Sequence, residues 1–268
     1  MAKLKFSVIG NPIKHSLSPE IHKYFASQFN LNDFVYEKIE ATKENFKKNI
    51  ETFFLNGGRG LNVTIPFKVS AFKLCHSLDT SAVFCGSVNT LISESSNIKG
   101  YNTDGIGFID DLAQKEIEYS CSNILVIGAG GSSMSIISSL LQQSTESNIA
   151  ILNRTKINAD NLITFFKNDR LIHHRSDTNY DLVINTTPMS MSKEEIVLPK
   201  DIIDAKTICY DLFYSKTRTA FQSWAYDNGA KICHDGLGML IQQAKHSFVI
   251  WNDLIPDVNN LEEKLREL

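Results

Sequence analysis

Short apolar runs alternate with longer amphipathic stretches along nearly the whole chain. Runs such as KFSVIG at 5–10, DFVYEKIEA at 33–41 and ILVIG at 124–128 have the length and bounding residues of strands. Between them lie stretches of helical length, such as SPEIHKYFASQFN at 18–30. Alternation of this kind predicts an α/β fold with largely parallel sheets.

The alternation changes character near Asp104, which predicts two lobes. Before that point we expect three strands, a helix over 18–30 with Ser18 placed to cap it, a helix over 43–58 closed by Gly57 and Gly58, and a hairpin of VNTLISE and NIKGYN. After it, NILVIGAGGSS opens a new βαβ series that continues through NIAILNRT, YDLVINTT and TICYDLFY. We therefore expect domains at 1–103 and 104–236. The last amphipathic helix, LIQQAKHSFVIWN, starts too late to belong to the second series.

Composition excludes several classes of protein. The 268 residues carry 43% hydrophobic and 21% charged side chains with a net charge of −3, and the two signs are mixed, so no nucleic-acid-binding face is expected. No apolar run is long enough to span a bilayer, and the start lacks a signal-peptide core. The five cysteines are widely spaced without a C-x-x-C pair. That pattern predicts reduced thiols in a cytoplasmic protein, without a disulfide framework or a metal site.

A glycine-rich turn follows the first strand of the second series. Gly128, Gly130 and Gly131 stand between a buried strand and a helix, where glycine lets the backbone approach a pyrophosphate at the helix N-terminus. Ser133 occupies the third position of the fingerprint, where glycine or alanine is usual. The alternative is a tight turn that binds no ligand.

The next strand ends in LNRT, and its sequence bears on the choice of cofactor. NAD-binding folds carry an acidic residue near this point to hold the ribose hydroxyls. The window NIAILNRTKIN contains no Asp or Glu, but it contains Arg154 and Lys156, which suit a 2′-phosphate. The alternative is a pair of solvated surface cations.

Polar residues collect at the ends of the elements in the first lobe. Ser16 and Ser18 stand at the start of a helix, where they could hold a small carboxylate. NVTIPFK, VNT and YNTDG add further groups, among them Lys68 at the end of a strand and Asp104 at the boundary of the lobes. Each has an alternative as a strand-end amide, a turn residue, a helix cap or, for Lys68, a solvated lysine that opens a helix.

Taken together and in order, these segments resemble the shikimate dehydrogenase family. The resemblance rests on GNPIKHSLSPEIH, GLNVTIPFK, GSVNTL, NTDGIGF, VIGAGGSS, NRT, YDLFY and DGLGMLIQQA, which cover nearly the full chain. It implies a two-lobed enzyme with a Rossmann-type NADP-binding domain over 104–236 and a substrate-binding domain over 1–103, to which the C-terminal helices of 237–268 return. The implied activity is the reversible NADPH-dependent reduction of 3-dehydroshikimate to shikimate in aromatic amino acid biosynthesis, by a monomer or homodimer.

The resemblance also implies roles for individual residues. Lys68 and Asp104 match the catalytic pair, and both also match substrate-binding positions. The other substrate-binding matches are Ser16, Ser18, Thr64, Asn89, Tyr214 and Gln243. The matches to cofactor-binding positions are Gly128, Ala129, Gly130, Gly131, Ser132, Asn153, Arg154, Thr155, Thr187, Leu212 and Gly236.

The implied chemistry suits these residue types. A ketone reduction needs a proton donor beside the carbonyl oxygen, and a lysine can donate the proton or stabilise the developing alkoxide. A nearby carboxylate would orient the ammonium and favour its charged form. Which of Lys68 and Asp104 transfers the proton stays open.

Three departures from the family pattern concern the cofactor lobe. Met134 stands where many members have arginine, Asn158 replaces a second basic residue, and Ser190 falls where glycine is frequent. Three alternatives to a shikimate dehydrogenase stay open. One is a quinate/shikimate dehydrogenase of broader substrate and cofactor use, another is an NADP-binding regulator without activity, and the third is a scaffold without a ligand.

Overall fold

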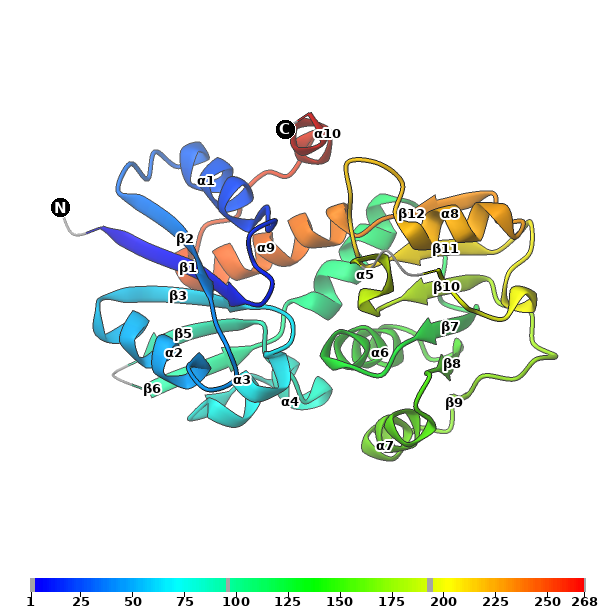
Figure 1. Cartoon of the computed structure of the whole chain (residues 1–268). Coiled ribbons are helices and arrows are strands. Elements are labelled where there is room, and N and C mark those ends of the chain that lie inside the picture. Colours follow the sequence, from blue (N-terminus) through cyan, green and yellow to red (C-terminus); the bar gives the residue numbers. More distant parts are fainter. Residues whose placement is uncertain (1–2, 95–96, 192–194, 268) are drawn as a thin grey trace. The chain divides into compact units, whose positions relative to one another are not determined.

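A computed structural model of the chain describes residues 3–94, 97–191 and 195–267 (Figure 1). The chain divides into two compact units. The first comprises Met1–Gly107 with Leu240–Leu265, and the second comprises Phe108–Met239 with Arg266–Leu268. The chain passes between the units within helix α5 (Asp104–Gln114) and helix α9 (Leu237–Asn252).

The first unit is built on a mixed sheet of six strands. Its spatial order is β2-β1-β3-β5-β6-β4. The strands are β1 (Leu4–Gly10), β2 (Phe34–Glu40), β3 (Gly58–Val63), β4 (Ser77–Leu78), β5 (Thr90–Glu94) and β6 (Asn97–Tyr101). Strand β1 pairs in parallel with β2 and β3, whereas β5 pairs antiparallel with both β3 and β6. The predicted hairpin pairing of β5 with β6 is therefore confirmed.

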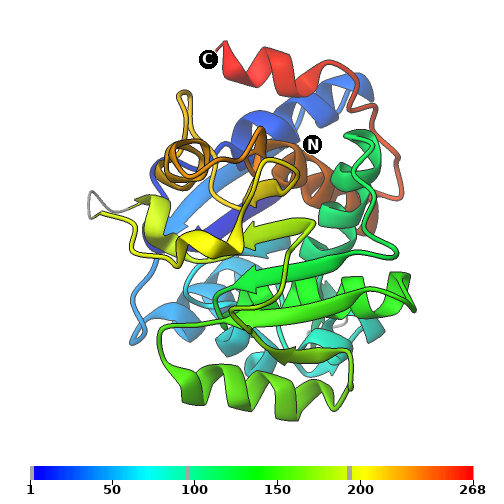
Figure 2. The same ribbon diagram turned by 90° about the vertical axis from the view of Figure 1, so that its right-hand side faces the viewer.

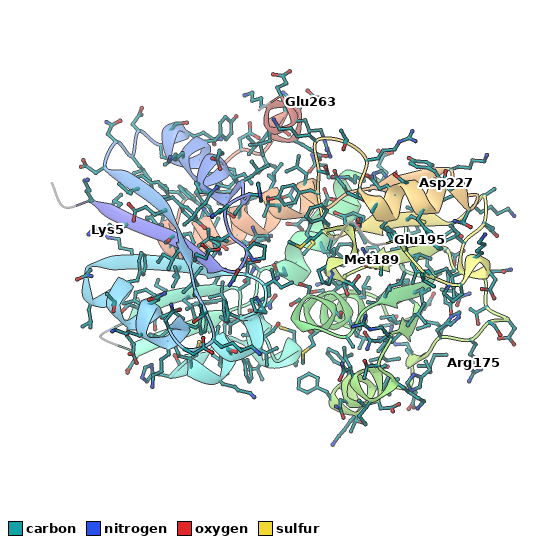
Figure 3. The ribbon with its side chains drawn as sticks, in the orientation of Figure 1. Lys5, Arg175, Met189, Glu195, Asp227 and Glu263 are labelled. Carbon is teal, nitrogen blue, oxygen red and sulfur yellow. The ribbon has the colours of Figure 1, made fainter. Side chains whose placement is uncertain are left out.

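Helices cover both faces of this sheet. On one face, α2 (Phe46–Leu55), α3 (Lys68–Leu74) and α4 (Thr80–Cys85) bury side chains against β1, β3 and β5. On the other face, aromatic side chains of α1 (Ser18–Gln28) and α9 pack on those of β1 and β2; the Phe6 and Trp251 rings, for example, are 5.0 Å apart. A last helix, α10 (Leu261–Arg266), follows α9. Figure 3 shows the side chains that fill these layers.

One expected helix cap was wrong, and one expected helix closure is confirmed. Ser18 is the first residue of α1 and makes no side-chain capping bond, because Leu17 occupies the N-cap position. Helix α2 ends at Leu55 with Asn56 as its C-cap, so the helix is shorter than the expected 43–58. Gly57 closes the helix as predicted, because its φ of +80° is one that only glycine adopts readily, and Gly58 already opens β3. The chain leaves the helix and enters the strand without a longer closing turn.

The second unit contains a sheet of six strands that all pair in parallel (Figure 2). The strands are β7 (Asn123–Ile127), β8 (Asn148–Leu152), β9 (Leu171–His173), β10 (Leu182–Asn185), β11 (Ile208–Asp211) and β12 (Ile232–His234). Their order, β9-β8-β7-β10-β11-β12, is that of a doubly wound dinucleotide-binding sheet with its switch point between β7 and β10. Such a sheet binds ligands beyond the carboxyl ends of its strands.

Both faces of this sheet are covered as well. Helices α5, α6 (Gly131–Gln143) and α7 (Lys156–Phe166) bury apolar side chains against β7 and β8 on one face. On the other face lie α8 (Ala220–Asp227) and the short 3-10 helix η2 (Lys200–Ile202). A second 3-10 helix, η1 (Pro188–Met191), follows β10 and contains Met189, which Figure 3 labels. The predicted α/β class with a Rossmann-type second sheet is confirmed.

Three negative findings hold for the part of the chain that the structure describes. No helix in that part is long and apolar enough to cross a membrane. No group of three or more His, Cys, Asp or Glu side chains there is placed to hold a metal ion. All five cysteines lie in that part and are free.

Candidate active site

A lysine and a carboxylate form a nearly buried ion pair in the first unit. Lys68 Nζ lies 2.8 Å from Asp104 Oδ2, and the two side chains are 13% and 7% exposed. Lys68 is the first residue of α3, five residues beyond the end of β3, so its expected position at a strand end was wrong. The alternative of a solvated lysine is wrong too, since the Lys68 side chain is only 13% exposed and its ammonium bonds a carboxylate.

Asn89 connects this pair to a second helix. Its amide nitrogen donates to Asp104 Oδ1 at 2.9 Å, to Gln243 Oε1 at 3.2 Å and to Thr103 Oγ1 at 2.9 Å. One oxygen of Asp104 therefore faces the lysine and the other faces Asn89. Four of the predicted residues, Lys68, Asn89, Asp104 and Gln243, thus converge from α3, the start of β5, α5 and α9.

A deeper polar layer supports these four residues. Asn62 Nδ2 lies within hydrogen-bond distance of Thr90 Oγ1 (3.1 Å) and Ser247 Oγ (3.0 Å), and the two hydroxyls are 2.7 Å apart. Thr103 N donates to Asn89 Oδ1 at 2.8 Å, which fixes the orientation of that amide. Asn62 is 5% exposed, so its side chain serves as a support beneath the pair.

The two predicted serines meet each other and a buried tyrosine. Ser16 Oγ and Ser18 Oγ are 3.1 Å apart, and the Ser18 hydroxyl also bonds Tyr36. Tyr36 donates in turn to Asn62 Oδ1 at 2.7 Å. Burial raises the pKa of Tyr36 well above its ordinary value, and the Ser18 bond acts in the opposite direction. A continuous series of polar contacts thus runs from the serine pair to the layer beneath Lys68.

His22, from the same SPEIH segment, stacks on Tyr36. The two ring centroids are 4.4 Å apart and the rings are nearly parallel. Burial lowers the pKa of His22 to about 3, against the weaker opposing effect of the Asn62 side chain, so the imidazole is neutral at physiological pH. His22 therefore contributes a neutral aromatic surface that packs against Tyr36, the partner of Ser18.

The remaining two substrate-binding candidates are Thr64 in the first unit and Tyr214 in the second. Thr64 follows β3 and is half-buried; its backbone N–H donates to Ile9 O at 2.9 Å. Tyr214 belongs to the second unit, where it follows β11 and its ring lies 6.1 Å from that of Phe213. The structure ties neither side chain to the Lys68–Asp104 pair by a described bond.

The glycine turn of the second unit has the geometry that its sequence predicts. Gly128 has a φ of +113°, and a Cβ there would lie 2.5 Å from Thr186 Oγ1. Gly130 is the N-cap residue of α6, and nothing lies within 4 Å of a Cβ built on it. The Ser133 hydroxyl accepts from Gly130 N at 3.1 Å and lies 2.6 Å from Thr186 Oγ1. The turn is thus closed toward the sheet and open on the side of Gly130, where a pyrophosphate would fit.

The residues after β8 form the start of α7. Asn153 Nδ2 donates to Thr155 O at 2.8 Å, Thr155 is the N-cap residue, and Arg154 is exposed. Lys156 Nζ lies 2.9 Å from Asp160 Oδ1, and His173 Nε2 lies 2.7 Å from the same oxygen. Of the two candidate cations, Lys156 therefore already has a carboxylate partner that the sequence did not suggest.

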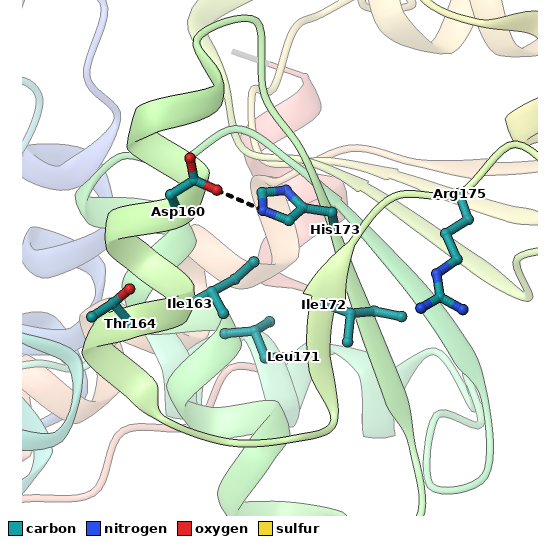
Figure 4. A pocket seen from close by; sticks show the side chains of 7 residues that line it. All are labelled: Asp160, Ile163, Thr164, Leu171, Ile172, His173 and Arg175. Carbon is teal, nitrogen blue, oxygen red and sulfur yellow. Dashed lines mark hydrogen bonds and ion pairs between the residues drawn. The ribbon is translucent and has the colours of Figure 1, made fainter.

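A shallow pocket of about 420 Å³ lies beside this pair, between α7 and β9 (Figure 4). Asp160 and His173 line it together with Ile163, Thr164, Leu171, Ile172 and Arg175. None of these residues was a site candidate. Ile163, Leu171 and Ile172 give the pocket an apolar part, whereas Asp160 and His173 give it a polar part. None of the glycine-turn residues lines it.

Three more cofactor candidates lie at the carboxyl ends of neighbouring strands. Thr187 follows β10, and its N–H and hydroxyl both donate to Asn185 Oδ1, at 3.0 and 2.7 Å. Leu212 follows β11, and Gly236 follows β12. A Cβ on Gly236 would lie 2.2 Å from Leu212 O, so only glycine fits there. These loops meet where a doubly wound sheet binds its ligand.

Comparison with known proteins agrees with this geometry. The family model described as shikimate dehydrogenase substrate binding domain matches residues 8–91, and the model described as shikimate/quinate 5-dehydrogenase matches residues 111–207. A protein of Legionella pneumophila (strain Lens), shikimate dehydrogenase (NADP(+)), is 40% identical over 264 residues, which are 98% of each chain. The chain belongs to the shikimate dehydrogenase family.

Solved structures of family members show the same fold. Shikimate dehydrogenase from Aquifex aeolicus is 32% identical, with a TM-score of 0.87 over 98% of this chain and 97% of that one. Shikimate 5-dehydrogenase from Thermus thermophilus, in complex with NADP(H) and shikimate, is 28% identical, with a TM-score of 0.86 over 98% and 99% of the two chains. The predicted family is therefore confirmed.

The three departures from the family pattern have distinct surroundings. Met134 is half-buried and packs against the apolar core of the second unit. Asn158 is exposed on the first turn of α7. Ser190 donates to Asp211 Oδ2 and accepts from Phe221 N at 3.1 Å. Only Ser190 thus adds polar contacts among the loops that carry predicted cofactor residues.

Proposed function

We propose that this member of the shikimate dehydrogenase family catalyses the reversible reduction of 3-dehydroshikimate to shikimate with NADPH, in the biosynthesis of aromatic amino acids. The observation that carries the proposal is the nearly buried pair of Lys68 and Asp104 within a polar cluster, 2.8 Å apart. A catalytically silent relative or a scaffold would have no use for an ammonium held in this way. Family membership supports the same reaction.

The first unit would bind the substrate and supply the proton. Ser16 and Ser18 would hold the carboxylate, while Thr64, Asn89 and Gln243 would bind ring hydroxyls, with Tyr214 contributing from the second unit. Lys68 would protonate the developing alkoxide or stabilise its charge, and Asp104 would orient the ammonium. Asn89 fixes Asp104 from the other side and so limits its rotation.

The second unit would bind NADPH, which supplies the hydride. Gly128, Ala129, Gly130, Gly131 and Ser132 would surround the pyrophosphate at the N-terminus of α6, because backbone N–H groups and the helix dipole favour an anion there. Asn153, Arg154 and Thr155 would hold the 2′-phosphate. Thr187, Leu212 and Gly236 would flank the nicotinamide. A cytoplasmic monomer or homodimer completes the proposal, and the five free cysteines support a reducing compartment.

One set of assays tests the proposal. The purified protein is given shikimate or quinate, each with NADP or NAD, and NAD(P)H absorbance is followed. We expect rapid turnover with shikimate and NADP and weaker turnover in the other three combinations. Comparable turnover with quinate or with NAD would favour the broader quinate/shikimate enzyme. No turnover in any combination would contradict the proposed function.

A further inference from the structure

A buried carboxylate in the second unit lies outside every role assigned so far. Asp211 is the last residue of β11 and is fully buried. Its Oδ1 accepts from Asn185 Nδ2 at 2.9 Å and from Phe213 N at 3.1 Å, and its Oδ2 accepts from the Ser190 hydroxyl. The Thr219 hydroxyl supplies a fourth bond. These contacts come from β10, from η1, from the loop after β11 and from the N-cap of α8.

The four donors are all uncharged. A buried charge normally requires an opposite charge, since its removal from water is costly. Here Asn185, Ser190 and Thr219 face the carboxylate with an amide and two hydroxyls, and the backbone of Phe213 adds an N–H. Among the residues that the structure describes, only neutral groups bond this fully buried anion, which makes it an expensive feature. Its role must depend on its capacity to accept several hydrogen bonds at once.

The bonds of Asp211 lead directly to the loops that carry the nicotinamide-side candidates. Asn185, held by Asp211, accepts from both the N–H and the hydroxyl of Thr187. Phe213, the residue between Leu212 and Tyr214, donates to Asp211 through its N–H, and its carbonyl accepts from Gly236 N at 3.1 Å. One carboxylate therefore fixes three loops relative to one another.

We propose that Asp211 is a positioning residue for the nicotinamide half of the cofactor, acting through Asn185 and the Phe213 backbone. The inference rests on the proposed function, because it takes Thr187, Leu212 and Gly236 as the residues beside the nicotinamide. Asp211 does not act on the adenosine half, whose residues lie in the glycine turn and after β8. An asparagine at this position would replace one of the two acceptor oxygens by an NH₂ group, which cannot accept the bonds made there, and would loosen the loops.

The carboxylate also makes the arrangement sensitive to pH. Burial raises the pKa of Asp211, and the bonds from Ser190, Thr219, Phe213 and Asn185 oppose that shift. As the pH falls through this raised pKa, the carboxyl gains a proton and loses acceptor capacity, so hydride transfer declines. Replacement of Ser190 by glycine removes one donor that favours the charged form. The decline should then begin at a higher pH.

The test compares Asp211→Asn, Ser190→Gly and a control variant, Asp111→Asn. Asp111 is equally buried in the same unit, but its partners are Lys115 and Tyr210. For each protein we would measure thermal unfolding, the pH profile of shikimate oxidation, NADPH binding by nicotinamide fluorescence, and binding of adenosine 2′,5′-bisphosphate by calorimetry. The last ligand lacks the nicotinamide.

Asp211→Asn should lower kcat roughly ten- to hundredfold, because small displacements at a reacting centre have effects of this size. It should weaken NADPH binding and leave adenosine 2′,5′-bisphosphate binding within about twofold. Ser190→Gly should move the acid limb of the kcat profile to higher pH. Asp111→Asn should lose stability and keep both kcat and the acid limb. If Asp211→Asn fails to fold, the pH profile of kcat for Ser190→Gly decides whether the inference holds.

A folded Asp211→Asn variant with unchanged kcat and NADPH affinity would overturn the inference. A Ser190→Gly profile that superimposes on the parent profile would do the same. If the parent itself does not oxidise shikimate, the proposed function fails. The comparison of NADPH with adenosine 2′,5′-bisphosphate still decides the role of Asp211 in that case, because it requires no turnover.

Discussion

The polar clusters of the two units are built in opposite ways. In the first unit, side chains from distant segments bond one another, and the bonds Asn62–Ser247 and Asn89–Gln243 join residues more than 150 positions apart. In the second unit the predicted cofactor site is formed largely by the backbone, with Gly128 at a φ of +113° and Gly236 against Leu212 O. A reacting carbonyl needs side-chain acids and bases, whereas a pyrophosphate can be held by backbone N–H groups. Substitutions should therefore act differently in the two units.

The largest effect should come from Lys68→Ala in the side-chain cluster. Loss of the proton donor should lower kcat by roughly two to four orders of magnitude, while KM for shikimate changes much less. Lys115→Ala is a matched control, because Lys115 also pairs with a buried carboxylate, Asp111, and is 14% exposed against 13% for Lys68. Both variants should lose stability, and only Lys68→Ala should lose turnover. A near-normal kcat in folded Lys68→Ala would show that Lys68 has no catalytic role.

The serine pair should affect binding more than turnover. The double variant Ser16→Ala and Ser18→Ala should raise KM for shikimate about a hundredfold, since bonds to a charged group contribute roughly 1.5–3 kcal/mol each. NADP affinity should stay the same. Stability should fall by about 1 kcal/mol through the lost bond to Tyr36, since Ser18 does not cap its helix. Ser27→Ala, an exposed serine of the same helix, is the control. Calorimetry that finds undiminished shikimate binding in the double variant would make both serines structural.

In the second unit, a methyl group added at Gly130 should weaken NADP binding without changing stability. Gly130→Ala adds a Cβ into open space at an ordinary φ of −100°, so the melting temperature should be unchanged. If the pyrophosphate passes there, KM for NADP should rise roughly ten- to fiftyfold, equivalent to about 1.4–2.3 kcal/mol. Gly128→Ala should instead destabilise the fold by about 1–3 kcal/mol through its positive φ. Equal NADP affinity in Gly130→Ala and the parent would place the cofactor elsewhere.

A smaller effect should follow from Arg154→Ala. A guanidinium can bind a 2′-phosphate with paired hydrogen bonds, so its loss should raise KM for NADP about tenfold and leave KM for NAD unchanged. Added salt should weaken the preference for NADP, because Arg154 is exposed. Arg175→Ala, at an exposed arginine of the pocket in Figure 4, is the control. Equal use of NADP and NAD by the parent protein would contradict this role.

The smallest effect should be a gain, from Asp160→Asn. The hydrogen bond from Lys156 is the main cause that lowers the pKa of Asp160, with His173 assisting, so Asp160 stays ionised throughout pH 6–8 and competes with a 2′-phosphate for Lys156. Removal of that charge should lower KM for NADP about two- to threefold without affecting NAD. Asp169→Asn, at another exposed carboxylate, should change neither value. Higher KM for NADP in Asp160→Asn would show that the carboxylate assists cofactor binding.

The sequence predicted most strands of both sheets, five of six in the first and four of six in the second. Buried runs such as ILVI and LVIN identify parallel strands by themselves, and the glycine turn has a local geometric cause. The two-residue β4 and three-residue β9 and β12 were not predicted, because runs so short carry no periodicity. Ser18 also looked like an N-cap by residue type, and only the backbone conformation at Leu17 shows otherwise.

The polar cluster of the first unit shows a second limit. Lys68 and Asp104 stood out by their positions in recognisable motifs. Thr90 stands in the motif GSVNTL without having been singled out, and Tyr36 and Ser247 lie in ordinary amphipathic segments. Tyr36, Thr90 and Ser247 matter because each bonds Asn62. They lie 26, 28 and 185 residues from Asn62 in the sequence. Contacts of that range depend on tertiary packing, which no local pattern encodes. Asp211 stands in the motif YDLFY, but its bonds come from separate segments, so only the fold shows its role.

The discontinuity of the first unit affects the order in which the protein can fold during synthesis. Residues 1–107 leave the ribosome well before residues 240–265, which complete the same unit. Until then, Phe6 lacks its Trp251 neighbour, and Asn62 lacks its bond to Ser247. The second unit is nearly continuous and can fold as soon as it is made. The nascent first sheet therefore exposes one apolar face for most of translation, and the N-terminal half of the chain depends on the last helices for its final packing.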